Sequence, residues 1–298
     1  MLILDEKKIR KGKPLGLPCQ GSKKKISKKI IEIIKQNFGT DKVVYDVFGG
    51  GGAITAECLL NGLSVYYNDL DKDATDMFVT IISEDRDYIK SLLVSREEFL
   101  TIRDKDDKTV DDNLKLLVNS FGNKSKNYLY GKEHADIKYR LAIEIIRKHD
   151  TFSGYKQTDT WLNQYRELGQ LQQLGQLEQL QRLQRLQQLE RLERLERLEQ
   201  LQQLHITNLD YRAFSEVEDA IFYLDPPYEN ATHGGYKGYF DSIDFYDWAF
   251  EMSKKNKVLI SSYEISDDRF MCVYEFKTAR STMQGGTGGK CEKLFMVK

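Results

Sequence analysis

The pattern of apolar and polar positions near the start of the chain predicts the first unit of an α/β fold. Isoleucines and a phenylalanine recur at helical spacing over residues 28–38, and Gly39 follows as a C-cap. After Gly39 come two β-rich runs with a helical segment between them, at residues 42–48, 63–67 and 53–60. Four glycines, 49–52, separate the first run from the helix, and the second run ends at Asn68-Asp69. Strand, glycine turn, helix, strand and acid is the order of a parallel βαβ unit.

A second unit of the same kind begins near residue 206, where globular patterning resumes. Its strand, helix and second strand are expected at residues 220–224, 245–255 and 257–261. Between the two units the chain is polar over 71–163, with helical patches such as 138–148. The sequence therefore predicts an α/β fold with a doubly wound, mostly parallel sheet, interrupted by a helical insertion.

Residues 168–204 have a different character, because thirteen leucines fall at strict intervals of three with only Gln, Glu, Arg and Gly between them. On an α-helix each leucine lies about 300° from the last, so the leucines form no single face. A 3₁₀-helix, a strand and a solenoid with rungs of a multiple of three remain alternatives. The good helix formers in the tract favour a helix. A partner-binding or DNA-facing arm, association between copies, and a tolerated repeat expansion are all open as roles.

The composition leaves room for one large domain or two medium ones, since 40% of the 298 residues are hydrophobic. The net charge of −1 excludes no class of partner, but residues 2–35 hold eleven Lys or Arg against three acids. Such a cluster gains affinity for a phosphate chain by releasing counterions, and a solvated lysine-rich surface is the alternative.

The cysteines and the hydropathy pattern indicate a reducing compartment. Cys19, Cys58, Cys272 and Cys291 form no C-x-x-C pair and have no histidine at ligand spacing, so we expect neither a disulfide framework nor a metal site. No stretch approaches the ~20 apolar residues of a membrane span, and the N-terminus lacks the apolar core of a secretory signal. We therefore expect a cytoplasmic protein that does not enter a membrane.

The glycines at 49–52 are the first candidate for chemistry. A strand that ends in glycines lets the backbone approach a ligand closely and points the next helix N-terminus at it. Asp69, at the end of the second strand, is placed to accept hydrogen bonds from ribose hydroxyls. The loop lacks the G-K-[ST] ending of a P-loop, which disfavours a phosphate site. A glycine-rich tight turn, with Asp69 as a turn or N-cap residue, is the structural alternative.

The strongest signal is the segment 225–228, because two of the four prolines of the chain follow an apolar strand directly. Two prolines make a rigid stop at the carboxyl end of the strand, where open α/β sheets place ligands. The segment also carries groups that suit an extruded adenine: Asp225 accepts a hydrogen bond from an amino proton, and Tyr228 offers a stacking face. A strand-ending turn with an incidental aromatic is the alternative.

Together these motifs resemble the DNA adenine methylase (Dam-like) family of amino-methyltransferases, in the circular order called the α group. Gly21-Ser22-Lys23 resembles the N-terminal G-x-K element of the family, and Asp46-x-Phe48-x-Gly50-x-Gly52 resembles its cofactor glycine motif. Asn68-Asp69 resembles the ribose-binding acid, and Asp225-Pro226-Pro227-Tyr228 resembles the catalytic tetrapeptide. Weaker matches are Asp210, Ser261-Ser262-Tyr263 and Glu292-Lys293-Leu294-Phe295. The resemblance covers about residues 15–85 and 205–298, and Cys19 stands where the family usually has an aromatic residue.

The resemblance implies a site-specific adenine DNA methyltransferase (EC 2.1.1.72), of the kind found in restriction–modification, that uses S-adenosylmethionine on double-stranded DNA. It implies a catalytic domain over 1–84 and 205–298, a target-recognition insertion over 85–167, and the leucine tract at 168–204. It assigns catalysis to Asp225, Pro226, Pro227 and Tyr228. It assigns cofactor contacts to Gly21, Lys23, Asp46, Phe48, Gly50, Gly52, Asp69 and Asp210.

The implied mechanism is base flipping followed by direct methyl transfer to N6. Asp225 and a proline carbonyl accept the amino protons, and the protein acts by positioning and electrostatics without a covalent intermediate. Basic residues of the N-terminal segment, or Lys124, Lys126 and Lys132, are candidates for phosphate contacts. Two alternatives stay open at this point: an amino-methyltransferase of cytosine N4, RNA or protein glutamine, and a non-catalytic binding protein on a decayed methyltransferase scaffold.

Overall fold

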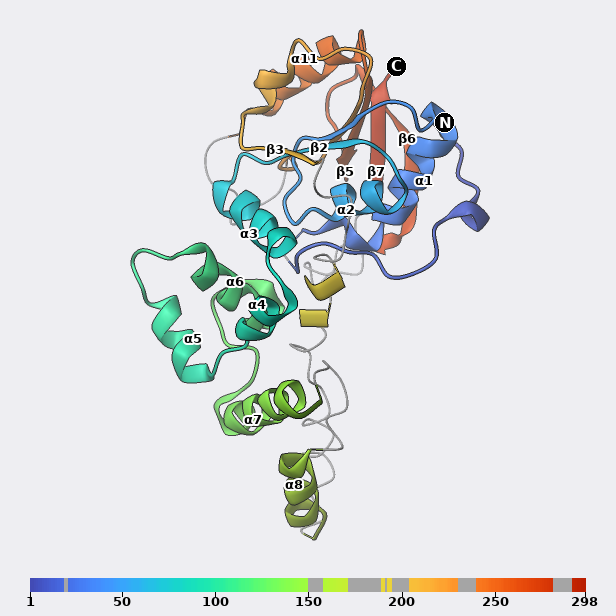
Figure 1. The fold of residues 1–298 in the computed structure, drawn as a ribbon. Coiled ribbons are helices and arrows are strands. Elements are labelled where there is room, and N and C mark those ends of the chain that lie inside the picture. Colours follow the sequence, from blue (N-terminus) through green and yellow to red (C-terminus); the bar gives the residue numbers. More distant parts are fainter. Residues whose placement is uncertain are drawn as a thin grey trace. The chain divides into compact units, whose positions relative to one another are not determined.

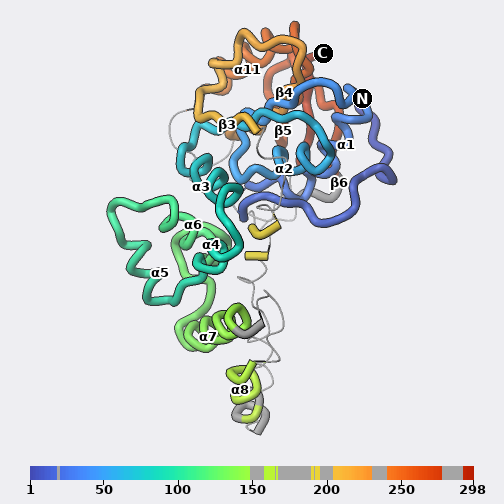
Figure 2. The backbone as a smooth tube through the Cα atoms, in the orientation of Figure 1, coloured from blue at the N-terminus to red at the C-terminus, as the bar shows by residue number. Residues whose placement is uncertain are grey.

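The computed structural model of the chain describes residues 1–18, 21–149, 158–170, 189–190, 192–194, 204–229, 240–280 and 291–298. These residues divide into two compact units, which are described separately. The sheet unit comprises residues 1–16, 22–75 and 198–298, and the helical unit comprises residues 17–21 and 76–197. Figures 1 and 2 follow the chain through both units, from blue at the N-terminus to red at the C-terminus.

The sheet unit contains a seven-stranded sheet in the order β3-β2-β1-β4-β5-β7-β6 (Figure 1). The strands, in chain order from β1 to β7, are Val44–Asp46, Val65–Asn68, His205–Thr207, Ile221–Leu224, Lys257–Ser262, Phe270–Arg280 and Cys291–Val297. Neighbouring strands from β3 to β5 pair in parallel, and β7 is antiparallel to both β5 and β6. The predicted α/β fold with a mostly parallel sheet is therefore confirmed.

Helices cover both faces of this sheet. The helices and 3₁₀ turns of the sheet unit are η1 (Glu6–Lys8), η2 (Lys23–Lys25), α1 (Ser27–Phe38), α2 (Ala53–Leu60), η6 (Tyr211–Phe214) and α11 (Ser242–Ser253). Helix α1 ends as the sequence predicts: Gly39 has a φ of 86°, and its N–H donates to the Lys35 carbonyl at 3.3 Å. Helix α11 begins at Asp241, whose side chain accepts hydrogen bonds from the N–H groups of Ile243 and Asp244.

Alternation along the strands places Tyr45, Tyr66 and Phe222 on one face of the sheet and Asp46 on the other. Tyr45 stacks on Tyr66 and on Phe222, with ring centroids 5.0 and 4.9 Å apart, across three neighbouring strands. This face packs under α11 in one core cluster that includes Phe245. On the opposite face, Asp46 of β1 is hydrogen-bonded to Thr55 of α2. The apolar face of the sheet is thus covered by α11, and the opposite face meets the helix that follows the glycine loop.

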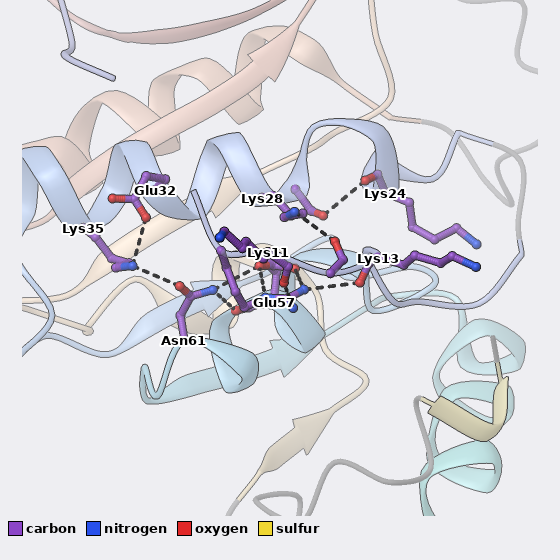
Figure 3. A network of polar contacts seen from close by, with 11 residues as sticks. Lys11, Lys13, Lys24, Lys28, Glu32, Lys35, Glu57 and Asn61 are labelled. Atoms are coloured by element: carbon purple, nitrogen blue, oxygen red, sulfur yellow. Dashed lines mark hydrogen bonds and ion pairs between the residues drawn. The ribbon is translucent and has the colours of Figure 1, made fainter. Parts of the chain in front are cut away.

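A strap formed by residues 10–16 is fastened to α1 and α2 by polar contacts (Figure 3). The Arg10 guanidinium donates two hydrogen bonds, of 2.8 and 2.9 Å, to the Glu57 carboxylate. Lys28 of α1 donates to the Gly12 carbonyl at 2.9 Å, and Lys35 joins α1 to Asn61 at 3.0 Å. The strap and the two helices are therefore one polar-linked assembly within the sheet unit.

The helical unit has its own small core. Its described helices are the end of α3 (Lys72–Ser83), α4 (Arg86–Ser91), α5 (Arg96–Arg103), α6 (Val110–Asn119), η3 (Phe121–Asn123), α7 (Lys132–His149) and α8 (Asp159–Gln170). A capping box between Thr109 and Asp112 begins α6. Phe99, Leu116 and Tyr128 belong to one buried cluster of this unit. The helical insertion expected from the sequence thus contains packed helices, of which α7 includes the predicted patch.

The expected elements of the sheet unit are present, some with shifted ends. The helix at 53–60 begins and ends where the sequence predicts, the predicted strands at 42–48 and 220–224 shorten to β1 and β4, and the strand predicted at 63–67 lies at 65–68 as β2. Most of the leucine tract lies outside the described residues, so its helical form stays a prediction. The assignments of catalytic, recognition and tract regions to fixed boundaries are likewise predictions. Among the helices that the structure describes, none is long and apolar enough to span a membrane.

Candidate active site

The candidate residues on β1, β2, β3 and β4 gather at one edge of the sheet, because these strands are parallel and their carboxyl ends lie side by side. The glycine loop follows β1, Asp69 follows β2, Asp210 comes shortly after β3, and the segment 225–228 follows β4. Open α/β sheets bind ligands at this edge. The topology therefore collects groups that are more than 150 residues apart in the chain.

The glycine loop packs closely against β2, which leaves no room for a side chain at its first position. A Cβ on Gly49 would overlap the ring of Tyr67, whose hydroxyl donates to the Gly50 carbonyl at 2.8 Å. Gly52 is the N-cap of α2 with a φ of 68°, a conformation that favours glycine. The loop therefore leaves the backbone bare at the N-terminus of α2.

Asp69 links this loop to the end of β2. Its Oδ2 accepts a hydrogen bond of 2.7 Å from the N–H of Gly50, and its Oδ1 accepts one of 2.7 Å from the N–H of Asp71. Burial raises the pKa of Asp69, and these two N–H donors oppose the shift. A carboxylate held in this way has lone pairs left for hydroxyl donors of a ligand.

An apolar pocket lies next to Asp69. It is lined by residues that include Phe48, Leu70, Leu209, Asp210, Tyr211 and Phe240. Leu70 and Leu209 are unusually open for large apolar side chains, at 59% and 44% exposure. Asp210, on the rim, accepts a hydrogen bond of 2.9 Å from the N–H of Arg212 and lies 3.4 Å from the Arg212 guanidinium, which also lines the pocket. A pocket with apolar walls and a carboxylate on its rim suits a planar ring that carries an amino group.

The segment 225–228 takes part in a buried polar cluster, which we call the Asp225 cluster: Lys23, Asp225, Tyr228, Ser261 and Glu292. The Lys23 ammonium lies 2.8 Å from Asp225 Oδ1 and 3.4 Å from Glu292 Oε1, and it donates to the Tyr228 hydroxyl at 2.8 Å. The Tyr228 hydroxyl lies 3.2 Å from Asp225 Oδ1 and donates a short hydrogen bond to Glu292 Oε1. Ser261 donates to the same Glu292 oxygen at 2.8 Å.

Burial sets the electrostatics of this cluster. It raises the pKa of Asp225 to about 6; the Lys23 ammonium opposes this shift and the Glu292 carboxylate adds to it. Burial and the two neighbouring carboxylates also raise the pKa of Tyr228 well above its usual value, so that the phenol stays neutral. The Tyr228 ring meets Tyr263 edge to face at 4.8 Å. Among these groups, the Lys23 ammonium is the one that favours the ionised form of Asp225, and Tyr228 keeps its proton.

The surroundings of two other candidate residues, Asp46 and Gly21, are also described by the structure. The Asp46 side chain is buried and accepts hydrogen bonds from the N–H and the hydroxyl of Thr55, at 3.1 and 2.7 Å. Burial raises the pKa of Asp46 to about 7, and these hydrogen bonds oppose the shift. Gly21 has a φ of 76° and belongs to the helical unit. Cys19, at the departure from the family pattern, lies outside the described residues.

The sequence interpretation left Ser261 and Glu292 out of the candidate site. Both fall in short stretches that matched the family pattern weakly, so a signal was present. Their importance appears only with the topology, because antiparallel β7 brings Glu292 next to β5 and to the end of β4. A strand of this direction could not be placed from the hydrophobic pattern alone.

The fold and the site together define a class of protein. A mostly parallel seven-stranded sheet with an antiparallel β7, a glycine loop after β1 and polar groups at the carboxyl edge are consistent with a methyltransferase fold. The family model for the D12 class N6 adenine-specific DNA methyltransferase matches residues 20–281, and the chain belongs to this family. This result confirms the resemblance inferred from the motifs. No curated protein matches the chain.

Proposed function

We propose that the protein transfers a methyl group from S-adenosylmethionine to N6 of an adenine flipped out of a specific site in double-stranded DNA. The observation that carries this proposal is the position of Asp225, held 2.8 Å from the Lys23 ammonium at the carboxyl edge of the sheet, the same edge that carries the glycine loop and the apolar pocket. The family supplies the reaction class, an N6-adenine DNA methyltransferase. The cofactor, the flipped base and the site specificity are the parts that we propose.

The residues of the pocket fit the nucleoside part of S-adenosylmethionine. Leu70 and Leu209 present open apolar surface for a purine ring, and the Asp210 carboxylate would accept a hydrogen bond from its amino group. Asp69 is placed to accept ribose hydroxyls. S-adenosylmethionine supplies a methyl group on a positively charged sulfur. The carboxylates at this edge favour a cation by simple electrostatics.

In the proposed reaction the chain positions and polarises the amino group of the target base. Asp225 and the carbonyl of Pro226 accept hydrogen bonds from its two N–H groups, which concentrates the nitrogen lone pair outside the ring plane. Lys23 holds Asp225 in place, and the Tyr228 ring stacks on the base. Such positioning and fixed charge account for large rate enhancements without a covalent intermediate.

A labelling experiment tests the reaction. The purified full chain is incubated with isotope-labelled S-adenosylmethionine and unmethylated duplex DNA, and the labelled nucleoside is identified. We expect N6-methyladenine. Label in N4-methylcytosine or in RNA would replace the substrate, and a protein that binds the cofactor without turnover would support the non-catalytic scaffold instead.

We expect Asp69→Asn to weaken S-adenosylmethionine binding by about 10- to 100-fold, since a hydrogen bond to a charged group contributes about 1.5–3 kcal/mol. The amide keeps the shape of the side chain but loses its charge and one acceptor. Titration calorimetry measures the Kd, and Asp73→Asn, an exposed change at the second residue of α3, is the control. Equal affinity of wild type and Asp69→Asn would remove Asp69 from the cofactor site.

Lysines of the strap and of η2 form a candidate phosphate-binding surface of the sheet unit. Lys11, Lys13 and Lys25 are exposed, and no carboxylate pairs with them among the described residues. In Figure 3 the side chains of Lys13 and Lys24 extend in the same direction. Lys23, next in sequence to Lys24, reaches Asp225, so this surface continues into the Asp225 cluster. A DNA backbone on it would pass beside the reacting base.

We expect the triple change Lys11→Gln, Lys13→Gln and Lys25→Gln to weaken DNA binding and to lower the slope of log K against log salt by about 2 to 3, at about 0.9 per phosphate contact. Fluorescence anisotropy with a labelled duplex at several salt concentrations measures the slope. The matched control changes three lysines at the amino end of β5, Lys254, Lys255 and Lys257. An equal loss in both triples would show only a general charge effect.

The helical unit carries a second candidate surface for DNA. Lys124 and Lys126 are exposed on the loop closed by the bridge between Ser120 and Tyr128. Phe121, on the same loop, is also exposed. An exposed ring beside lysines suits stacking on an unpaired base while the lysines meet phosphates. Lys132, the first residue of α7, is exposed as well.

A further inference from the structure

We propose that Glu292 is a positioning residue for the methyl transfer: it accepts the hydrogen bond of the Tyr228 hydroxyl and thereby leaves Asp225 free to accept a hydrogen bond from the amino group of the target base. This inference rests on the proposed function of Asp225. It adds a residue that lies 67 positions further along the chain, on the antiparallel strand β7.

The fold delivers Glu292 to the cluster through strand pairing. In the register of β5 and β7, Ser261 faces Leu294 and Ser262 faces Lys293, so Glu292 lies just beyond the paired residues, at the carboxyl end of β5. Its side chain is only 9% exposed. A carboxylate buried to this extent needs several donors, and it has them in Ser261, Tyr228 and Lys23.

The hydrogen-bond geometry supports this role. Tyr228 has one hydroxyl proton and two carboxylate acceptors within reach: Glu292 Oε1, to which it is hydrogen-bonded, and Asp225 Oδ1, 3.2 Å away. Lys23 approaches Asp225 at Oδ1, the same oxygen that lies near Tyr228. Without Glu292 as acceptor, the Tyr228 hydroxyl would donate its hydrogen bond to Asp225. It would then compete there with the amino group of the target base.

Charge acts in the same direction as the hydrogen bonds. The groups that face Asp225 are Lys23 from η2, Tyr223 from β4, Tyr228, Glu292 from β7 and Asp46 from β1. The negative charge of Glu292 raises the pKa of Asp225, which makes Asp225 a stronger hydrogen-bond acceptor. Methyl transfer needs the ionised form, so the rate rises with pH through the pKa of Asp225. Without the Glu292 charge, that rise is expected at lower pH.

The test is Glu292→Gln, with Glu275→Gln on the exposed face of the neighbouring strand β6 as the matched control. We expect kcat for adenine methylation to fall about 10- to 100-fold with little change in KM for DNA or cofactor, because positioning is lost and binding is not. The acid limb of the kcat profile should move to lower pH. In a Tyr228→Phe background the loss of kcat caused by Glu292→Gln should be smaller, since no hydroxyl proton is left to redirect.

A second measurement does not depend on turnover. Carboxyl carbon NMR of the aspartate-labelled protein follows the titration of Asp225 directly, and we expect its midpoint to fall in Glu292→Gln. If that variant does not fold, Ser261→Ala, which removes one anchor of Glu292, should give a smaller shift of the same sign. A wild-type enzyme that methylates adenine, with an unchanged kcat and acid limb in Glu292→Gln, would overturn the role of Glu292. A wild type without adenine methylation would instead overturn the proposed function.

Discussion

Asp225→Asn is expected to lower kcat for adenine methylation by about 10²–10³-fold, the size of effect that follows removal of one preorganised polar group at a reacting centre. The amide has nearly the shape of the carboxylate but one acceptor fewer and no charge. Lys23 would then face a neutral side chain and turn toward Glu292, which already lies 3.4 Å from its ammonium. The amino group of the target base would lose the acceptor that concentrates its lone pair.

The control for this variant is Asp219→Asn, at the other end of β4, where an exposed carboxylate pairs with Lys42. Initial rates with saturating cofactor and duplex DNA give kcat, and calorimetry gives the cofactor affinity, which should change little in either variant. An Asp225→Asn enzyme with wild-type turnover would refute the assigned role of Asp225. A loss of the same size in Asp219→Asn would point to the fold instead.

The second large effect is on stability. Arg10→Met is expected to lower the free energy of unfolding of the sheet unit by about 3–5 kcal/mol, the usual cost of removing one partner from a buried ion pair. The Glu57 side chain is only 1% exposed. Without Arg10, its remaining side-chain donor among the described residues is Asn61, at 3.1 Å.

The size of this loss is measured by urea unfolding, and a double variant tests its cause. Urea unfolding followed by Trp248 fluorescence in a Trp161→Phe background reports on the sheet unit, since the chain has two tryptophans. The double variant Arg10→Met with Glu57→Met should recover much of the loss; no recovery would contradict the ion-pair explanation.

Local signals predicted the elements that carry the chemistry. Gly39 ended α1 because glycine readily adopts a positive φ, and the glycines at 49–52 marked the turn between β1 and α2. The prolines at 226 and 227 marked the end of β4. Each of these features depends on a few consecutive residues, which is why the sequence alone revealed them.

The parts that escaped prediction depend on contacts between distant residues. Strand β3 has only three residues and is specified by pairing with β2, because Asn68 binds Thr207 and Leu209. The contribution of Glu292 depends on the direction of β7, and direction leaves no trace in a hydrophobic pattern. The surroundings of Asp46 also required the structure, which shows its carboxylate bound to Thr55.

The pairing of β2 with β3 has a consequence for how the chain can change in length. Asn208 donates to the carbonyls of Asp69 and Leu70, at 2.5 and 2.9 Å. The point where the chain leaves the sheet after β2 is therefore hydrogen-bonded to the point where it returns after β3. A segment inserted between these two points has its ends held together by the sheet. Each doubling of the length of such a segment costs only about 0.6 kcal/mol of loop entropy. Tandem leucine triplets could therefore be gained or lost in evolution, and recognition modules exchanged by engineering, without disturbing Asp69 or the pocket beside it.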